Sequence, residues 1–184
     1  MTCHTQNWIQ YFNEPIFCEL FIEILKLAKK MKKFDLYAFV VLLEHFHIMF
    51  FPHQASDLSK IIQFIKRNFT RNMNFILGYT DEGAINKSLL QLREEYKIHE
   101  EIIKIYFKYL IGLRKEFITK YGLNQSQFPK FRWEKFYRDH YIRNTKDFDE
   151  HVKYIYNNPF KHKIPDAENY KYIFTNYPDL IDEF

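Results

Sequence analysis

The stretch that decides the fold is LLEHFHIMFF at residues 42–51, in which two histidines flank one phenylalanine inside an apolar run. A continuous aliphatic and aromatic run precedes it at residues 36–42, and Pro52 follows it. Two such runs with a polar residue between them, here Glu44, are typical of two strands joined by a tight turn. We therefore predict a buried strand over residues 36–42 and a returning strand over residues 45–51.

The two histidines of this stretch share one face of the predicted strand. Side chains at positions i and i+2 of a strand project to the same side, so His45 and His47 should point together while Phe46 points away. Two neutral imidazoles side by side supply half of a metal site. The alternative is a pair of ordinary strand histidines that face solvent, and a short H-x-H motif taken alone favours it.

The remaining elements follow from hydrophobic periodicity. Further strands are expected at residues 2–5 and 131–143. Helices are expected where apolar side chains recur at helical spacing: residues 14–33, residues 56–71 (opened by Ser56), residues 84–121 (as one helix or two, with Gly122 as the cap) and residues 145–158. This order predicts one α+β domain over residues 1–184, with an antiparallel sheet, helices packed on one face and a helical insertion at about residues 73–130.

The composition fits a globular domain, since 47% of the 184 residues are hydrophobic and 27% are charged. The net charge of +4 is too small to argue for nucleic acid by itself. Cys3 and Cys18 form neither a C-x-x-C motif nor a disulfide framework, which fits a reducing cytosol. No charged leader with an apolar run opens the chain, and no run reaches about 18 apolar residues. We therefore expect a cytoplasmic protein without membrane contact.

The predicted C-terminal helix carries a second set of polar side chains. At about 100° per residue, Tyr154 and Asn158 lie one above the other on a flank of the apolar stripe, with His151 nearby. If this helix covers the histidine face, an amide oxygen completes a three-ligand site for Mg²⁺ or Mn²⁺, with positions left for water and a phosphate oxygen. The alternative for Tyr154 is an ordinary packed helix tyrosine.

Two blocks of the sequence resemble a known family. The triplet His45-Phe46-His47 after an apolar strand resembles the His-hydrophobic-His motif of the HUH endonucleases. WEKFYRDHYIRNTKDF at residues 133–148, followed by YIYNNP at residues 154–159, closely resembles the second half of the REP-associated tyrosine transposases, which are single-tyrosine HUH transposase relatives. The resemblance implies a ferredoxin-like HUH transposase fold.

The resemblance also implies roles for individual residues. His45 and His47 match the two metal-binding histidines, Tyr154 matches the nucleophile, and Asn158 matches the third metal-site residue. The implied reaction is a transesterification on single-stranded DNA near hairpins, assisted by Mg²⁺ or Mn²⁺, that leaves a 5′-phosphotyrosine link and a free 3′-hydroxyl. His151 is a candidate helper, although a single helix histidine is more often structural.

Two basic stretches gain a meaning from this resemblance, because lysine runs otherwise mark solvated helix faces. They fit a DNA backbone path, and the DNA-binding candidates are Lys29, Lys30, Lys32, Lys33, Lys66, Arg67 and Arg71. The expected partner is single-stranded or hairpin DNA, and the family includes both monomers and homodimers. Two competing hypotheses are a catalytically inactive, domesticated protein that binds hairpin DNA or RNA, and an interaction protein that uses the helical insertion.

Overall fold

A three-stranded antiparallel sheet forms the centre of the computed structural model, which describes residues 1–54, 58–122 and 128–183. The strands are β1 (Thr2–His4), β2 (Phe34–Leu42) and β3 (His45–Pro52), in the order β1-β3-β2. β2 and β3 form the predicted hairpin, with Leu42 opposite His45 across the turn. The predicted antiparallel sheet in a mixed α/β fold is confirmed, and the strand that carries both histidines lies in the middle.

Helices fill most of the remaining chain. They are α1 (Pro15–Lys32), α2 (Leu58–Ile76), α3 (Glu82–Tyr96), α4 (Glu100–Tyr121), α5 (Thr145–Tyr156) and the short α6 (Asn158–Lys161). The expected opening at Ser56 lies outside the described residues. The segment predicted as one long helix or two forms α3 and α4, which are separated by a turn with Lys97 at a positive φ of 52°. Gly122 ends α4 at a φ of 73°.

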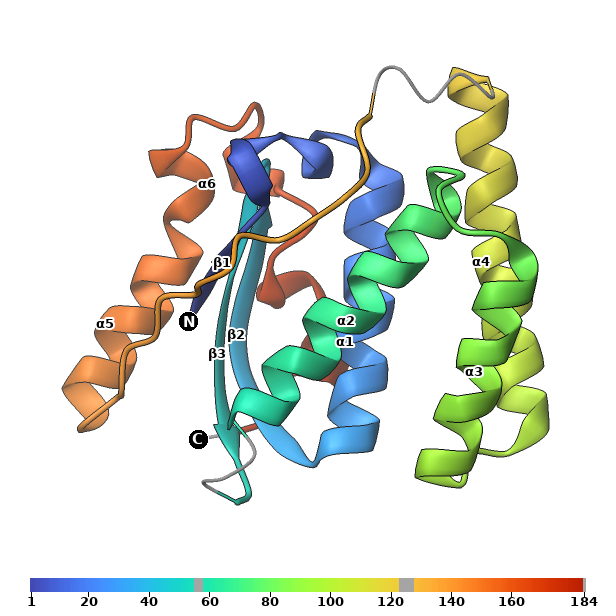
Figure 1. The fold of residues 1–184 in the computed structure, drawn as a ribbon. Coiled ribbons are helices and arrows are strands. Elements are labelled where there is room, and N and C mark those ends of the chain that lie inside the picture. Colours follow the sequence, from blue (N-terminus) through green and yellow to red (C-terminus); the bar gives the residue numbers. More distant parts are fainter. Residues whose placement is uncertain (55–57, 123–127, 184) are drawn as a thin grey trace.

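The helices cover both faces of the sheet rather than the one face predicted from the sequence, and β2 and β3 are accordingly buried on both sides. On one face, Phe39, Phe46 and Ile48 join the main core with α1 and α2. On the other face, Val40 packs in a smaller cluster with Ile155 of α5. Figure 1 shows this arrangement, with α5 on one side of the sheet, α1 and α2 on the other, and α3 and α4 farther out beyond α1 and α2. α5 is the predicted C-terminal helix, so its packing places that helix on the face of the sheet that carries the two histidines.

The strand predicted over residues 131–143 is wrong. This segment runs along β1 (Figure 1) but forms only isolated bridges, Thr5 with Trp133 and Thr2 with Arg138. β1 has only three residues, so it offers too few backbone groups for a continuous ladder. The alternation that suggested a strand does not bury one face, because Phe136 is 78% exposed.

Later parts of the chain also contact the outer edge of β2. Val40 bridges Ile173, and the Val41 N–H donates to the Tyr172 carbonyl at 3.0 Å. Both outer strands of the sheet are therefore bordered by irregular segments, residues 131–143 beside β1 and residues 172–173 beside β2.

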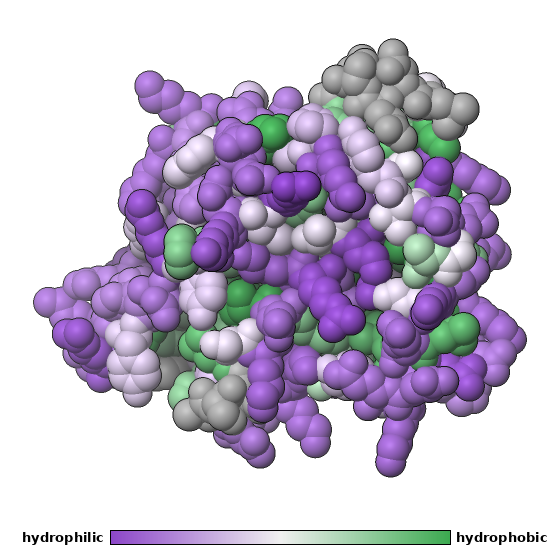
Figure 2. Space-filling view, in the orientation of Figure 1, coloured by the Kyte–Doolittle hydropathy of each residue, from purple (hydrophilic) through white to green (hydrophobic). Residues whose placement is uncertain are grey.

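One face of the molecule is mostly polar (Figure 2). Figure 2 shows hydrophilic side chains over most of the face seen in Figure 1, with apolar side chains visible between them. Among the residues that the structure describes, no helix combines the length and the apolar character needed to cross a membrane.

Candidate active site

The two strand histidines meet on the face of β3 that α5 covers. His45 is 3% exposed and His47 is 7% exposed, and their Nε2 atoms lie 3.2 Å apart. The alternation of side chains along β3 explains this, since Phe46 between them packs into the opposite core at 0% exposure. The structure therefore places the two imidazoles together and out of solvent.

Hydrogen bonds at the far side of each ring set the direction of the lone pairs. The Glu44 carboxylate lies 2.9 Å from Nδ1 of His45, and the Thr2 hydroxyl lies 2.7 Å from Nδ1 of His47. A carboxylate accepts, so Nδ1 of His45 carries the proton, and Nδ1 of His47 can donate to Thr2 in the same way. Both Nε2 lone pairs then point at one place, which is unfavourable for two neutral rings alone and favourable around a cation.

Both imidazoles are neutral at physiological pH. Burial lowers the pKa of His45 to about 3, with a further contribution from the nearby His4 and His162. Burial also lowers the pKa of His47 to about 3, helped by His45, the N-terminal amine and the same two histidines. Neutral imidazole is the form that binds metal, so burial prepares this pair as ligands.

Asn158 supplies an oxygen atom without a partner. Its side chain is 1% exposed, and its Nδ2 donates to the Tyr154 carbonyl at 2.6 Å. Its Oδ1 is buried and has no hydrogen-bond partner among the described residues. Leaving a buried amide oxygen unsatisfied costs roughly 1–3 kcal/mol, so a bound ligand at this atom would stabilise the protein. Neutral imidazole nitrogens and an amide oxygen are both metal-ligand types, and the oxygen is the type that Mg²⁺ and Mn²⁺ favour.

Tyr154 lies beside this group at the end of α5. Its ring centroid is 5.3 Å from that of His47 in an edge-on arrangement, and the side chain is 43% exposed. Lys161 from α6 places its Nζ 4.1 Å from the centroid of the Tyr154 ring. The phenol is thus open to a substrate, next to a candidate metal ligand and next to a positive charge.

Five of these neighbours, including Thr2, are absent from the sequence-based site. His4 stacks on His45 with ring centroids 4.7 Å apart, and its Nδ1 is buried without a partner among the described residues, while His162 lies 5.0 Å from His45. Lys161 and His162 lie beyond the predicted end of the helix at residue 158, so helical periodicity gave no signal for them. For Thr2, His4 and Glu44 there was also none, because their contacts depend on the strand register and on the turn.

A cavity of about 690 Å³ opens next to Tyr154 and His47. β3, α5 and residues 138–142 line it, and most of its lining is apolar. Tyr141 at its border is 81% exposed, and Phe51 is 56% exposed. Exposed aromatic rings beside a groove are suited to stacking unpaired bases.

His151 lies in the same cavity but within a different cluster. Its Nδ1 is 2.8 Å from the Asp147 carbonyl and 3.1 Å from the Asp147 carboxylate, and its ring stacks on His140 at 4.4 Å. The ligand-type atoms of these three residues lie within 4.8 Å of one another. Asp147 also accepts from the Arg143 N–H at 3.0 Å at the start of α5, so structural hydrogen bonds account for its position.

The structure separates the seven basic DNA-binding candidates. Lys29 is ion-paired with Asp182 at 2.7 Å, and Lys66 donates to the Glu134 carbonyl at 2.9 Å. Lys30 and Lys33 are exposed near the end of α1. The other three, Lys32, Arg67 and Arg71, line one pocket between α1, α2 and α3.

The structure thus has a histidine pair on the central strand and a tyrosine and an amide on helices α5 and α6. Comparison with known proteins finds similarity to one group of proteins. The REP-associated tyrosine transposase of Escherichia coli (strain K12) is 48% identical to the chain over 50 residues, which is 27% of each protein. The matched region thus spans only about a quarter of that curated relative.

The fold comparison covers far more of the chain. A solved structure of a REP-associated tyrosine transposase bound to a REP hairpin superimposes with a TM-score of 0.57 and 19% identity, over 94% of this chain and 73% of the other. No family model matches the sequence. The resemblance to REP-associated tyrosine transposases is confirmed in a short sequence block and in the overall fold.

Proposed function

We propose that this protein is a metal-dependent single-stranded DNA endonuclease and strand transferase that cuts near DNA hairpins through a 5′-phosphotyrosine intermediate. One observation carries the proposal: the buried Nε2 atoms of His45 and His47 meet on the face where Tyr154 is exposed and Asn158 has an unsatisfied oxygen. The similarity to a REP-associated tyrosine transposase, and to one solved with a REP hairpin, supports the same substrate class.

His45, His47 and Asn158 would hold the Mg²⁺ or Mn²⁺ ion. When bound there, the ion would withdraw electron density from the scissile phosphate and stabilise its added negative charge. Glu44 and Thr2 hold the two rings in the orientation that this requires. His4 and His162 pack around His45 and keep water from its ring.

Tyr154 is the nucleophile in this proposal. Its phenolic oxygen forms a bond to the phosphorus atom, the bond from phosphorus to the 3′ oxygen breaks, and the released 3′ oxygen takes up a proton. Lys161 at the Tyr154 ring adds a positive charge that stabilises the phenolate. His151 is the proposed route for the phenol proton, because it lines the same cavity one turn earlier on α5. Reversal of the step with another 3′-hydroxyl joins strands.

The cavity beside Tyr154 is the proposed path of the single strand. Its apolar lining and the exposed rings of Tyr141 and Phe51 provide stacking surfaces that tolerate any base. The solvent-exposed Lys30 and Lys33 are the proposed backbone contacts, because no carboxylate among the described residues pairs with them as Asp182 pairs with Lys29.

A covalent adduct assay tests the proposal. The protein is mixed with labelled hairpin oligonucleotides from its own genome in the presence of Mn²⁺ or Mg²⁺, and a slower band is sought on a denaturing gel. A metal-dependent adduct supports the proposal. Hairpin binding without an adduct under any metal condition would instead support the alternative of a catalytically inactive hairpin DNA- or RNA-binding protein.

A further inference from the structure

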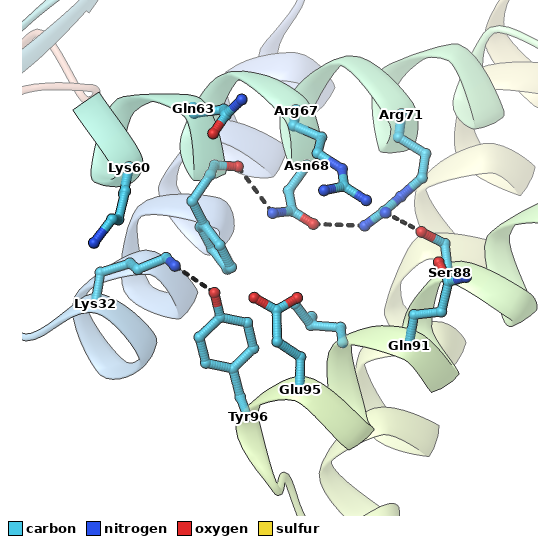
Figure 3. A pocket seen from close by; sticks show the side chains of 12 residues that line it. Lys32, Lys60, Gln63, Arg67, Asn68, Arg71, Ser88, Gln91, Glu95 and Tyr96 are labelled. Atoms are coloured by element: carbon cyan, nitrogen blue, oxygen red, sulfur yellow. Dashed lines mark hydrogen bonds between the residues drawn. The ribbon is translucent and has the colours of Figure 1, made fainter. Parts of the chain in front are cut away.

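A second pocket lies on the opposite side of the sheet from Tyr154, between α1, α2 and α3. Its volume is about 260 Å³, and its charged and aromatic lining includes Lys32, Arg67, Arg71, Glu95 and Tyr96. Figure 3 shows α2 above the pocket, α3 below it and Lys32 of α1 at one end. The proposed DNA cleavage uses none of these side chains.

The charge of this pocket is unbalanced. Leaving Lys60 aside, three of the lining residues are cationic and one is anionic, the cations being Lys32, Arg67 and Arg71, and the anion Glu95. Lys32 donates to the Tyr96 hydroxyl and also lies 4.8 Å from the centre of that ring. Both of these contacts are with a neutral side chain, so they leave the excess of positive charge in place.

Arg71 is the most deeply placed of these cations. Its guanidinium donates to the Ser88 hydroxyl and, at 2.5 Å, to the Asn68 amide oxygen, while its Nε is buried and has no hydrogen-bond partner in the described part of the chain. Burial lowers the pKa of Arg71 to about 10, so the group remains charged at neutral pH after losing much of its hydration. Buried charges are normally paired, and both acceptors here are neutral.

A second guanidinium stands one helical turn away on the same face of α2. Arg67 points into the pocket without a hydrogen bond to the other residues drawn in Figure 3. Like charges at positions i and i+4 destabilise a helix. The side chain of Asn68 is fixed by its own hydrogen bond to the Phe64 carbonyl at 2.8 Å, and its amide oxygen in turn positions the guanidinium of Arg71. An anion between the two guanidinium groups would remove the repulsion and supply the missing partner.

We propose that this pocket binds a phosphate group, held by Arg67 and Arg71. Planar guanidinium forks match phosphate oxygens in pairs, which makes arginine a suited ligand for this group. The volume also admits an organic portion beside the phosphate, and Phe64 and Leu92 provide an apolar wall for it. The phosphate is carried either by a free anion or nucleotide, or by the backbone of a nucleic acid strand.

Calorimetric titration of the full chain at low ionic strength tests the proposal. The probes are inorganic phosphate, dAMP and a hairpin oligonucleotide, applied to the wild type, to Arg67→Gln and to Lys108→Gln. Arg67 is exposed, so its replacement preserves the fold, and Lys108 is an exposed α4 residue outside the pocket that matches the change in charge. Arg71→Lys adds a variant that keeps the buried charge and loses the paired donors.

We expect Arg67→Gln and Arg71→Lys to weaken binding at least tenfold, with Lys108→Gln close to the wild type. If inorganic phosphate and dAMP show this pattern, the pocket takes a free phosphate or a nucleotide. If only the oligonucleotide shows it, the phosphate belongs to a strand, and that arm rests on the proposed DNA binding. Equal affinities of all variants for all three probes would overturn the proposal. Tyr154→Phe should leave phosphate binding unchanged, so failure here is distinguishable from failure of the cleavage chemistry.

Discussion

Nδ1 of His45 lies 2.9 Å from the carboxylate of Glu44, the preceding residue, which belongs to the turn between β2 and β3. Glu44 itself lies outside β3, and its side chain is only 12% exposed. The carboxylate therefore faces the back of the ring whose Nε2 meets that of His47. This contact makes Glu44 a positioning residue for the candidate metal site.

Glu44→Gln should weaken Mn²⁺ binding by about 10–100-fold while leaving the fold intact. Glutamine keeps the size of the side chain but loses the charge that fixes the proton on Nδ1 of His45. Calorimetric titration with Mn²⁺ measures the effect, and Glu101→Gln on the exposed face of α4 is the matched control. His45→Ala should abolish binding. Unchanged Mn²⁺ affinity in both Glu44→Gln and His45→Ala would remove the proposed metal site.

Tyr154→Phe should eliminate the covalent DNA adduct without reducing hairpin affinity, because the substitution removes only the attacking oxygen. Tyr156→Phe is the matched control, since this neighbouring α5 tyrosine is similarly exposed, at 46% against 43%. The adduct is quantified on a denaturing gel, and affinity is measured separately by fluorescence anisotropy. If the adduct persisted in Tyr154→Phe and vanished in Tyr156→Phe, the nucleophile would be Tyr156.

Phe46→Ala should destabilise the fold by about 3–5 kcal/mol, the usual cost of deleting a buried aromatic side chain. Phe46 is 0% exposed and packs against Phe21 at 4.5 Å and Trp133 at 5.4 Å between ring centroids. Urea unfolding followed by circular dichroism measures the change. Phe136→Ala serves as the comparison, and because that ring is 78% exposed its loss should cost less than about 0.5 kcal/mol.

Stability should fall as the pH rises above about 8.5, where a cysteine of the unfolded chain begins to ionise. Burial raises the pKa of Cys3 to about 11 in the folded state, so the folded thiol keeps its proton while the unfolded one loses it. The unfolded state then binds fewer protons, and the free energy of unfolding decreases toward pH 11. Cys3→Ala should show a shallower decrease than the wild type in urea unfolding between about pH 8 and pH 9, a range below most tyrosine ionisation. Parallel curves for the two proteins would contradict this assignment.

Local periodicity predicted the elements that hold the candidate site. The period of two placed His45 and His47 on one face, and the period of 3.6 placed Tyr154 near Asn158, because both patterns depend on neighbours in the chain. The pattern also indicated that residues 84–121 form one helix or two. The chain breaks between α3 and α4 at Lys97, which has a positive φ. A lysine does not signal such a turn in a sequence, so the position of the break was not predicted.

The failures involve contacts between distant segments. The side chains of residues 131–143 alternate as in a strand, yet β1 has only three residues and offers too few backbone groups for a continuous ladder. His4 reaches His45 because the two are paired across β1 and β3, and that register depends on the whole sheet. Which of the seven basic residues line the pocket and which are exposed likewise depends on how α3 packs over α2. The spacing of lysines along one helix does not reveal that packing.

The two segments that border the sheet have a consequence for assembly. An uncovered outer strand offers unpaired N–H and C=O groups to a strand of another chain. Here residues 131–143 occupy part of the outer side of β1, and residues 172–173 occupy part of the outer side of β2. Both come late in the chain, so the sheet edges are open to aggregation until these segments dock during folding. Once they have docked, the stretches of the two edges that they occupy are closed to a strand of a second chain.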